Sequence, residues 1–111
     1  MIEKPFVILK RRGEQIRLYH QEIYYIERNL RKTKFHCITE EYECSEKLSS
    51  FEEKLGDSFI RCHNSFLVNL SYIKMMKRNE LILSNGERIS VSNSRSKMTR
   101  EALLRYLINE R

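Results

Sequence analysis

The sequence predicts a mainly β domain with two helices, and three observations support this fold class. Short runs rich in Ile, Val, Tyr and Phe recur from residue 7 to residue 91, separated by turn-forming or charged residues. Only two stretches, 45–56 and 94–108, repeat their apolar residues at helical spacing. The chain has 111 residues and a hydrophobic content of 41%, enough for one modest core but not for a second domain. We therefore expect a single domain over residues 1–111.

The chain opens with a predicted β-hairpin. Residues 7–9 and 16–19 are apolar-rich runs on either side of a turn that contains Gly13, which supplies the backbone freedom that a tight turn needs. Residues 22–27 are rich in Tyr and Ile and predict the next strand. Two further strands, expected at 35–39 and 42–44, complete a meander.

A short helix is predicted after this meander. Leu48, Phe51 and Leu55 recur at helical spacing. Ser45 can accept hydrogen bonds from the free N–H groups of the first turn, and Gly56 can end the helix. We expect this helix to pack on the sheet.

The second half of the chain predicts more strands and a terminal helix. The strands are expected over residues 59–69, 72–77, 80–84 and 88–91. Asn85 and Gly86 separate the last two and fit the positive backbone angles of a type I′ turn. From Ser94 onward apolar residues are mixed with many charges, as in an amphipathic C-terminal helix.

The charge balance favours an anionic partner. Lys and Arg number 21 against 15 Asp and Glu, which gives a formal net charge of +6. Clustered positive charge attracts polyanions, so DNA, RNA and an acidic membrane surface all fit, and a solubilising surface is the plain alternative.

The cysteines and the start of the chain indicate a cytoplasmic protein with no membrane partner. Cys37, Cys44 and Cys62 are odd in number and form no C-x-x-C pair, which argues against a disulfide framework and against a zinc site. No run of about 18 apolar residues is present, and the first residues lack the apolar core of a signal peptide.

Three polar segments have the side chains that DNA recognition requires: donors and acceptors for base edges, and cations for phosphates. Residues 28–34, expected as a loop, carry four cations and two small polar side chains, although a charged hairpin tip is often only solvated. In the second segment, the Asn64 amide can pair with an adenine edge, while Ser65 and Arg61 can hold phosphate. The alternative there is a corner in which Asn64 caps backbone groups.

The third segment lies at the start of the final helix. Free N–H groups at a helix N-terminus favour phosphate, and Arg95 and Lys97 add positive charge. The alternative is a helix cap by Ser92 or Ser94, which is compatible with a phosphate contact.

The order of these motifs resembles the LytTR family of bacterial DNA-binding domains. The matching segments, in order, are residues 22–34, Arg61-Cys62-His63-Asn64-Ser65, Val68-Asn69-Leu70, Asn85-Gly86 and residues 91–97. Together they cover roughly residues 8–107, which we expect to be the core of the domain. One position departs from the family pattern: Ser-Arg usually follows the last strand, and this chain has Ser92-Asn93, with arginine two positions later at Arg95.

The resemblance implies elongated antiparallel β sheets whose three segments line up on one side and enter successive major grooves of duplex DNA. Thr33 or Lys34, Asn64 and Asn93 fall where the family contacts bases. With Asn93 in place of the usual arginine, the third contact either passes to Arg95 or favours a different base. The full set of candidate DNA-binding residues is Arg31, Lys32, Thr33, Lys34, Arg61, His63, Asn64, Ser65, Asn93, Arg95 and Lys97.

The resemblance also implies the output domain of a bacterial response regulator in a two-component system. Such a domain binds paired half-sites as a dimer on DNA and is controlled by a receiver domain elsewhere in a longer parent protein. Recognition of this kind uses side chains and charge alone, so we expect no metal and no cofactor.

Enzymatic activity is not expected, and the alternative function is another kind of binding. Cys62 and His63 are adjacent, so on a strand they point to opposite faces and cannot form a nucleophile–base pair. The alternative is a basic β module that binds RNA or a protein partner. Exposed aromatic side chains would favour single-stranded RNA, and burial of all four candidates would remove that interpretation; the candidates are Tyr24, Tyr25, Phe35 and Phe66.

Overall fold

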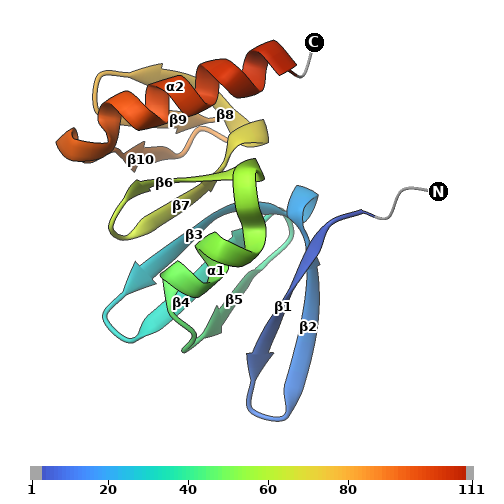
Figure 1. Ribbon diagram of the computed structural model, residues 1–111. Coiled ribbons are helices and arrows are strands. Elements are labelled where there is room, and N and C mark those ends of the chain that lie inside the picture. Colours follow the sequence, from blue (N-terminus) through green and yellow to red (C-terminus); the bar gives the residue numbers. More distant parts are fainter. Residues whose placement is uncertain (1–3, 110–111) are drawn as a thin grey trace.

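The alternation of apolar and polar side chains produces short antiparallel strands along most of the chain. The computed structural model describes residues 4–109, which form ten strands in three antiparallel sheets, a short internal helix and a C-terminal helix (Figure 1). The mainly β fold class predicted from the sequence is therefore confirmed. Two 3-10 turns, His20–Glu22 and Leu70–Tyr72, connect strands, and a third, Gly56–Ser58, connects the internal helix to the strand that follows.

The first sheet is the predicted hairpin of β1 (Phe6–Arg11) and β2 (Glu14–Tyr19). Gly13 turns the chain at a φ of 66°, a left-handed conformation that glycine adopts without steric cost. Val7, Leu9 and Leu18 are buried in the first of two core clusters, so this hairpin packs on the main sheet rather than standing alone.

The main sheet has the strand order β5-β4-β3-β7-β6. Its strands are β3 (Ile23–Asn29), β4 (Lys32–Cys37), β5 (Glu41–Cys44), β6 (Phe59–His63) and β7 (Phe66–Asn69). The central strand β3 pairs with β4 on one side and with β7 on the other. The expectation of a loop over residues 28–34 was wrong, because both strands extend through this segment and only Leu30 and Arg31 form the turn.

The helix α1 (Leu48–Leu55) covers one face of the main sheet and closes the first core cluster. Leu48, Phe51 and Leu55 are buried, as their spacing predicted, and Gly56 ends the helix at a φ of 63°. The proposed cap by Ser45 was wrong: the helix begins later, and its N-cap residue, Lys47, makes no side-chain hydrogen bond.

The third sheet has the order β10-β9-β8, with β8 (Ile73–Lys77), β9 (Glu80–Leu83) and β10 (Arg88–Ser90). The predicted hairpin at Asn85-Gly86 is present, but it is not a type I′ turn, because Gly86 has a φ of 93° while Asn85 lies outside the positive-φ region. The Gly86 N–H donates to the Leu83 carbonyl at 2.9 Å and the Leu83 N–H to the Glu87 carbonyl, also at 2.9 Å. This pattern is typical of a three-residue turn in which glycine forms a bulge.

The C-terminal helix α2 (Asn93–Asn109) packs against β6 and contributes Leu103 to the second core cluster. Leu104, Leu107 and Ile108 are exposed on it, so less of the helix is buried than an amphipathic pattern predicts. No helix among residues 4–109 is long and apolar enough to cross a membrane.

Candidate nucleic-acid interface

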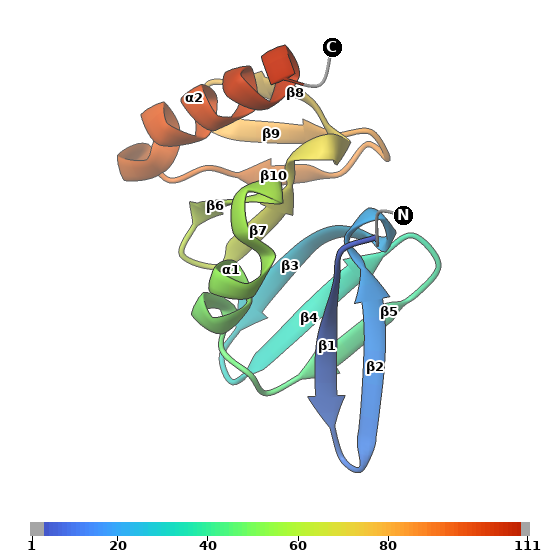
Figure 2. The same cartoon turned by 45° about the vertical axis from the view of Figure 1, so that its right-hand side comes forward.

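The three polar segments singled out by the sequence lie along one edge of the molecule. The β3–β4 turn, the β6–β7 turn and the start of α2 follow one another on the left-hand side of both Figure 1 and Figure 2. Backbone hydrogen bonds connect neighbours: the Arg28 N–H donates to the Ser65 carbonyl at 2.8 Å, and the Ser92 N–H donates to the Cys62 carbonyl at 2.9 Å. We call this the turn edge, comprising residues 29–32, 63–65, 77–79 and 92–97.

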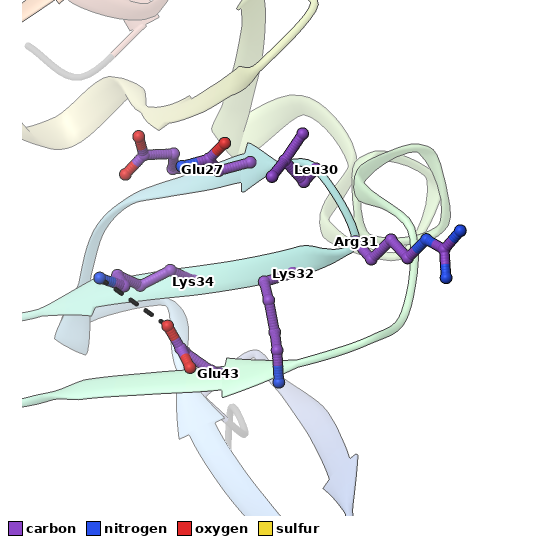
Figure 3. Close-up of a pocket in the computed structure, with 7 residues that line it drawn as sticks. Glu27, Leu30, Arg31, Lys32, Lys34 and Glu43 are labelled. Carbon is purple, nitrogen blue, oxygen red and sulfur yellow. Dashed lines mark ion pairs between the residues drawn. The ribbon is translucent and has the colours of Figure 1, made fainter.

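The β3–β4 turn presents two cations and one leucine to solvent. Leu30, Arg31 and Lys32 are exposed, and they line an open hollow beside β4 (Figure 3). Lys34, further along β4, is half-buried, and its ammonium nitrogen lies 3.8 Å from a carboxylate oxygen of Glu41 and 3.8 Å from one of Glu43. Ion pairs of this length at a surface are weak, so Lys34 can exchange its partners for another anion.

Thr33 does not belong to the exposed set, which corrects its assignment as a base-contacting candidate. Its side chain is fully buried. Its hydroxyl accepts from an Arg28 Nη1 donor at 2.7 Å and donates to the Glu46 carbonyl at 2.6 Å. Successive side chains of β4 point to opposite faces of the sheet, so Thr33 points toward the buried face while its neighbours Lys32 and Lys34 point toward the other. Its role is to anchor the hairpin to the segment before α1.

The β6–β7 turn orients the ring of His63 and presents Asn64 at its tip. The Ser65 N–H donates to Nδ1 of His63 at 3.0 Å, which makes that ring nitrogen an acceptor and orients the imidazole. The His63 ring also packs against Phe66, with 5.2 Å between centroids. Asn64 lies at the tip and is exposed. Of the predicted trio, Asn64 is thus the exposed residue, whereas His63 and Ser65 are half-buried.

Arg61 folds back into this turn, whereas its assignment as a phosphate ligand predicted a side chain directed outward. Its guanidinium donates to the carbonyl of His63 at 3.1 Å and to that of Asn64 at 2.6 Å. It also pairs with Glu52 on α1 at 2.8 Å, and the Arg61 side chain is only 15% exposed. These bonds use three of the five N–H donors of the guanidinium and direct it toward the protein.

Arg95 connects the start of α2 to the β6–β7 turn. Its guanidinium donates to the Arg61 carbonyl at 3.3 Å and to Oδ1 of Asn64 at 3.4 Å. Lys97 and Asn93 are exposed beside it. The structure thus brings the second and third predicted segments into direct side-chain contact at Asn64.

A fourth turn belongs to the same edge, and sequence reasoning missed it. Lys77, Arg78 and Asn79 form the exposed β8–β9 turn. The Asn79 amide donates to Oδ1 of Asn93 at 2.6 Å, and the Asn79 carbonyl accepts from the Val91 N–H at 2.8 Å. The signal was present in the sequence as Arg78 and Asn79 between two predicted strands, directly after Lys77 at the end of the first.

Cys62 has the environment of a core side chain. It is fully buried, its thiol donates to the Ser90 carbonyl at 3.6 Å, and burial raises the pKa of this thiol to about 12. A thiol that stays protonated is a poor nucleophile. Among residues 4–109, His, Cys, Asp and Glu side chains form no group of three that could hold a metal ion.

The aromatic side chains that could have stacked on RNA bases are covered to different degrees. Tyr25 and Phe35 are buried, whereas Tyr24 and Phe66 are half-buried. Tyr24 packs edge-on against Tyr72 with 4.9 Å between centroids, and Phe66 packs against Tyr25 at 6.2 Å. The four aromatic side chains are therefore not all buried, yet none of them forms an exposed surface on which a base could stack.

Comparison with known proteins identifies the class to which this edge belongs. The family model of the LytTr DNA-binding domain matches residues 13–104, so the chain is a member of the LytTR family of DNA-binding domains. A solved structure of this class is the LytTr DNA-binding domain of a protein described as a methyl-accepting/DNA response regulator from Bacillus cereus. It superposes with a TM-score of 0.78 and 34% sequence identity, over 91% of this chain and 98% of that one.

A curated relative shares part of the sequence. The sensory transduction protein LytT of Bacillus subtilis (strain 168) is 40% identical over 68 residues, which cover 56% of this chain and 28% of the relative. The matched part of the chain thus spans little more than a quarter of the length of that relative.

Proposed function

We propose that this domain binds duplex DNA in a sequence-specific manner, as the output domain of a bacterial transcriptional regulator, with its turns inserted into successive major grooves. The observation that carries the proposal is the alignment of polar turns from three parts of the chain along one edge of a LytTR domain. Major-groove recognition needs rigid projections that carry both base-reading and phosphate-holding side chains, and this edge supplies both.

Asn64 is the proposed base-reading residue of the central turn. An Asn amide can accept from adenine N6 and donate to adenine N7. Its carbonyl oxygen has two lone pairs, so Oδ1 can keep the bond from Arg95 while it accepts from a base. Arg95 would therefore orient Asn64 rather than read a base itself.

The outer contacts are proposed for the remaining polar residues of the turn edge and for Lys34. Asn93, oriented by Asn79, remains the third base-contacting candidate, and Lys34 remains the candidate from the β3–β4 hairpin. His63 and Ser65 shape the central turn, and the hydroxyl of Ser65 stays a proposed phosphate contact. The exposed cations proposed to hold phosphates are Arg31, Lys32, Lys77, Arg78 and Lys97.

We further propose that two copies bind paired half-sites in the cytoplasm and that a receiver domain in a longer parent protein controls them. The greater length of LytT, which is described as a sensory transduction protein, supports a longer parent. RNA or protein binding remains an outcome of the experiment below and gains no support from the aromatic side chains.

The test is selection of random duplex DNA by the purified domain, followed by affinity measurements at several salt concentrations. Asn64→Ala should cost about 1 to 3 kcal/mol on the selected site and less on random DNA. Lys32→Ala should weaken binding to both DNAs alike and lower the salt slope by about one. Lys74→Ala, an exposed lysine on β8 outside the turn edge, is the matched control and should leave the slope unchanged.

Two outcomes would contradict the proposal. Equal losses for Asn64→Ala on selected and random DNA would exclude base reading by this residue. Recovery of DNA without any enriched motif, lost as salt is raised, would leave a basic domain that binds polyanions without sequence preference.

A further inference from the structure

Leu30 is the most exposed large apolar side chain described in the molecule, at 91% of its accessible surface. It also has a φ of 58°, in the left-handed region that side chains other than Gly, Asn and Asp rarely occupy. Both features are unfavourable for leucine, because the backbone is strained and no apolar surface is buried. Glycine would fit the same turn without strain, so folding does not explain why leucine stands here.

The position of Leu30 on the turn edge supplies a different explanation. The last backbone pair of the hairpin joins Asn29 to Lys32, so Leu30 and Arg31 project beyond the end of the sheet. Figure 3 shows Leu30 at the end of β3 and Arg31 extending away from the strands. An apolar side chain thus stands beside the cations Arg31 and Lys32, which are proposed to hold the phosphates that flank a groove.

The major groove offers one apolar group to such a side chain. Every base pair presents hydrogen-bonding atoms there, but only thymine carries a methyl group, at C5. An exposed leucine can neither donate nor accept a hydrogen bond, so removal of water from a thymine methyl is the interaction open to it.

We propose that Leu30 determines specificity by contacting the C5-methyl group of a thymine in the first groove. This inference rests on the proposed function, since it requires the β3–β4 turn to enter the major groove. It adds a T·A preference next to the phosphate contacts of Arg31 and Lys32. It also assigns a purpose to the strained backbone at the turn.

Deoxyuridine tests the contact at the level of one methyl group, because it pairs as thymidine does but lacks C5-methyl. Each thymine of the selected duplex is replaced in turn, and the Kd of the domain is measured for every duplex. Loss of one buried methyl weakens binding by a factor of about four. The wild-type domain should show this loss at one thymine per half-site, and Leu30→Gly should show none at that position.

Two further variants separate the contact from indirect effects. Leu30→Met keeps an apolar side chain and should retain the discrimination against deoxyuridine. Leu107→Ala removes another exposed leucine, at the far end of α2, and should retain it as well. Circular dichroism would verify that Leu30→Gly folds, which is expected because glycine accepts the positive φ.

The outcomes distinguish this inference from the proposed function. In one outcome, the domain selects a motif that depends on Asn64, but Leu30→Gly does not abolish the loss of affinity caused by deoxyuridine at any thymine. This result would overturn the role of Leu30 and leave the proposed function standing. Absence of any selected motif would overturn the proposed function, and the role of Leu30 with it.

Discussion

At the scale of single residues, the shape of the turn edge depends on side chains that form hydrogen bonds and ion pairs within the domain. Arg61 connects three elements: its donors hold two carbonyls of the β6–β7 turn, and its charge meets Glu52 on α1. Asn64 can be held at the tip of this turn because Arg61 fixes the backbone beneath it and Arg95 contacts its amide oxygen. The proposed base contact of Asn64 therefore depends on residues that need not touch DNA.

Arg61→Ala should lower the free energy of unfolding by about 1 to 3 kcal/mol, because the partly buried bond to the His63 carbonyl and the exposed bond to the Asn64 carbonyl are both lost. It should also weaken binding to the selected site. Arg61→Lys should not restore stability, since an ammonium cannot reproduce the fork that spans both carbonyls. Urea unfolding and Kd measurements check both effects.

The control for Arg61 is Glu52→Gln, which removes the ion pair and keeps the turn bonds. It should cost no more than about 1 kcal/mol, because the carboxylate side is 45% exposed. If Arg61→Ala left stability unchanged and lowered the salt slope by one, Arg61 would be a phosphate ligand after all.

The sequence predicted which polar and charged residues lie at or near the turn edge better than it predicted which of their side chains point outward. Exposure of Lys32, Asn64 and Lys97 follows the expectation, whereas Thr33 and Arg61 turn inward. A bulge shifts the register between Arg61 and His63, and strand alternation read from the sequence cannot anticipate such a shift.

At the scale of elements, two hairpins reach the edge through turns in which a residue other than glycine has a positive φ. These residues are Leu30 on the β3–β4 turn and Arg78 on the β8–β9 turn, at 58° and 48°. The sequence predicted the strands that flank both turns. It could not predict the strained turns, because the residues that adopt the positive φ, Leu30 and Arg78, are neither Gly nor Asn, which normally mark this conformation.

Arg78→Gly should leave the domain as stable as the wild type or slightly more stable. Relief of a left-handed backbone is worth about 1 to 2 kcal/mol, and the added freedom of glycine in the unfolded chain offsets about 0.4 to 1 kcal/mol. Binding should nevertheless weaken on all DNA sequences, with a salt slope lower by about one. Arg105→Ala, exposed toward the end of α2, should change neither quantity; an unchanged slope for Arg78→Gly would exclude this turn from the interface.

The junction between β5 and α1 contains a carboxylate whose protonation should affect stability. Burial acts to raise the pKa of Glu46, but hydrogen bonds from Lys54, at 2.6 Å, and from Ser50 outweigh it, so this pKa lies below the ordinary value of 4.5. Because the folded pKa is lowered, Glu46 stabilises the fold above its unfolded pKa. This contribution is lost as pH falls through the folded pKa.

Glu46→Gln should therefore be less stable than the wild type at pH 7, and the difference should shrink in acid, below about pH 4. Urea unfolding at pH 7 and at pH 3 measures it. Glu53→Gln, exposed on α1, serves as the matched control for loss of a carboxylate. If the difference in free energy of unfolding between Glu46→Gln and the wild type were the same at both pH values, the ionised carboxylate of Glu46 would not be stabilised by Lys54 and Ser50.

At the scale of the whole molecule, the central strand β3 joins the two halves of the core. Ile26 lies in the first cluster, with β1, β2 and α1, while Tyr25 lies in the second, with β8, β9, β10 and α2. The pairing of β3 with β7 matches residues about forty positions apart, such as Tyr25 with Val68. Local sequence patterns identify strands but do not select such partners, so the strand order and the position of the edge emerge only in three dimensions.

The dimensions of the molecule limit how much DNA one copy can cover. Its extents are 41 × 40 × 24 Å, so the turn edge is no longer than about 12 base pairs at 3.4 Å each. One copy should therefore protect no more than about one helical turn of DNA in hydroxyl-radical footprinting. Two copies on paired half-sites should lie on the same face of the duplex when the half-sites are about 10 to 11 base pairs apart.

Insertion of five base pairs between the half-sites should move the two copies to opposite faces, and insertion of ten should return them to the same face. If the copies touch when bound, cooperativity should fall with five inserted pairs and recover in part with ten. Protection of two helical turns by a single bound copy would contradict this geometry, because the described residues form too short an edge to reach that far.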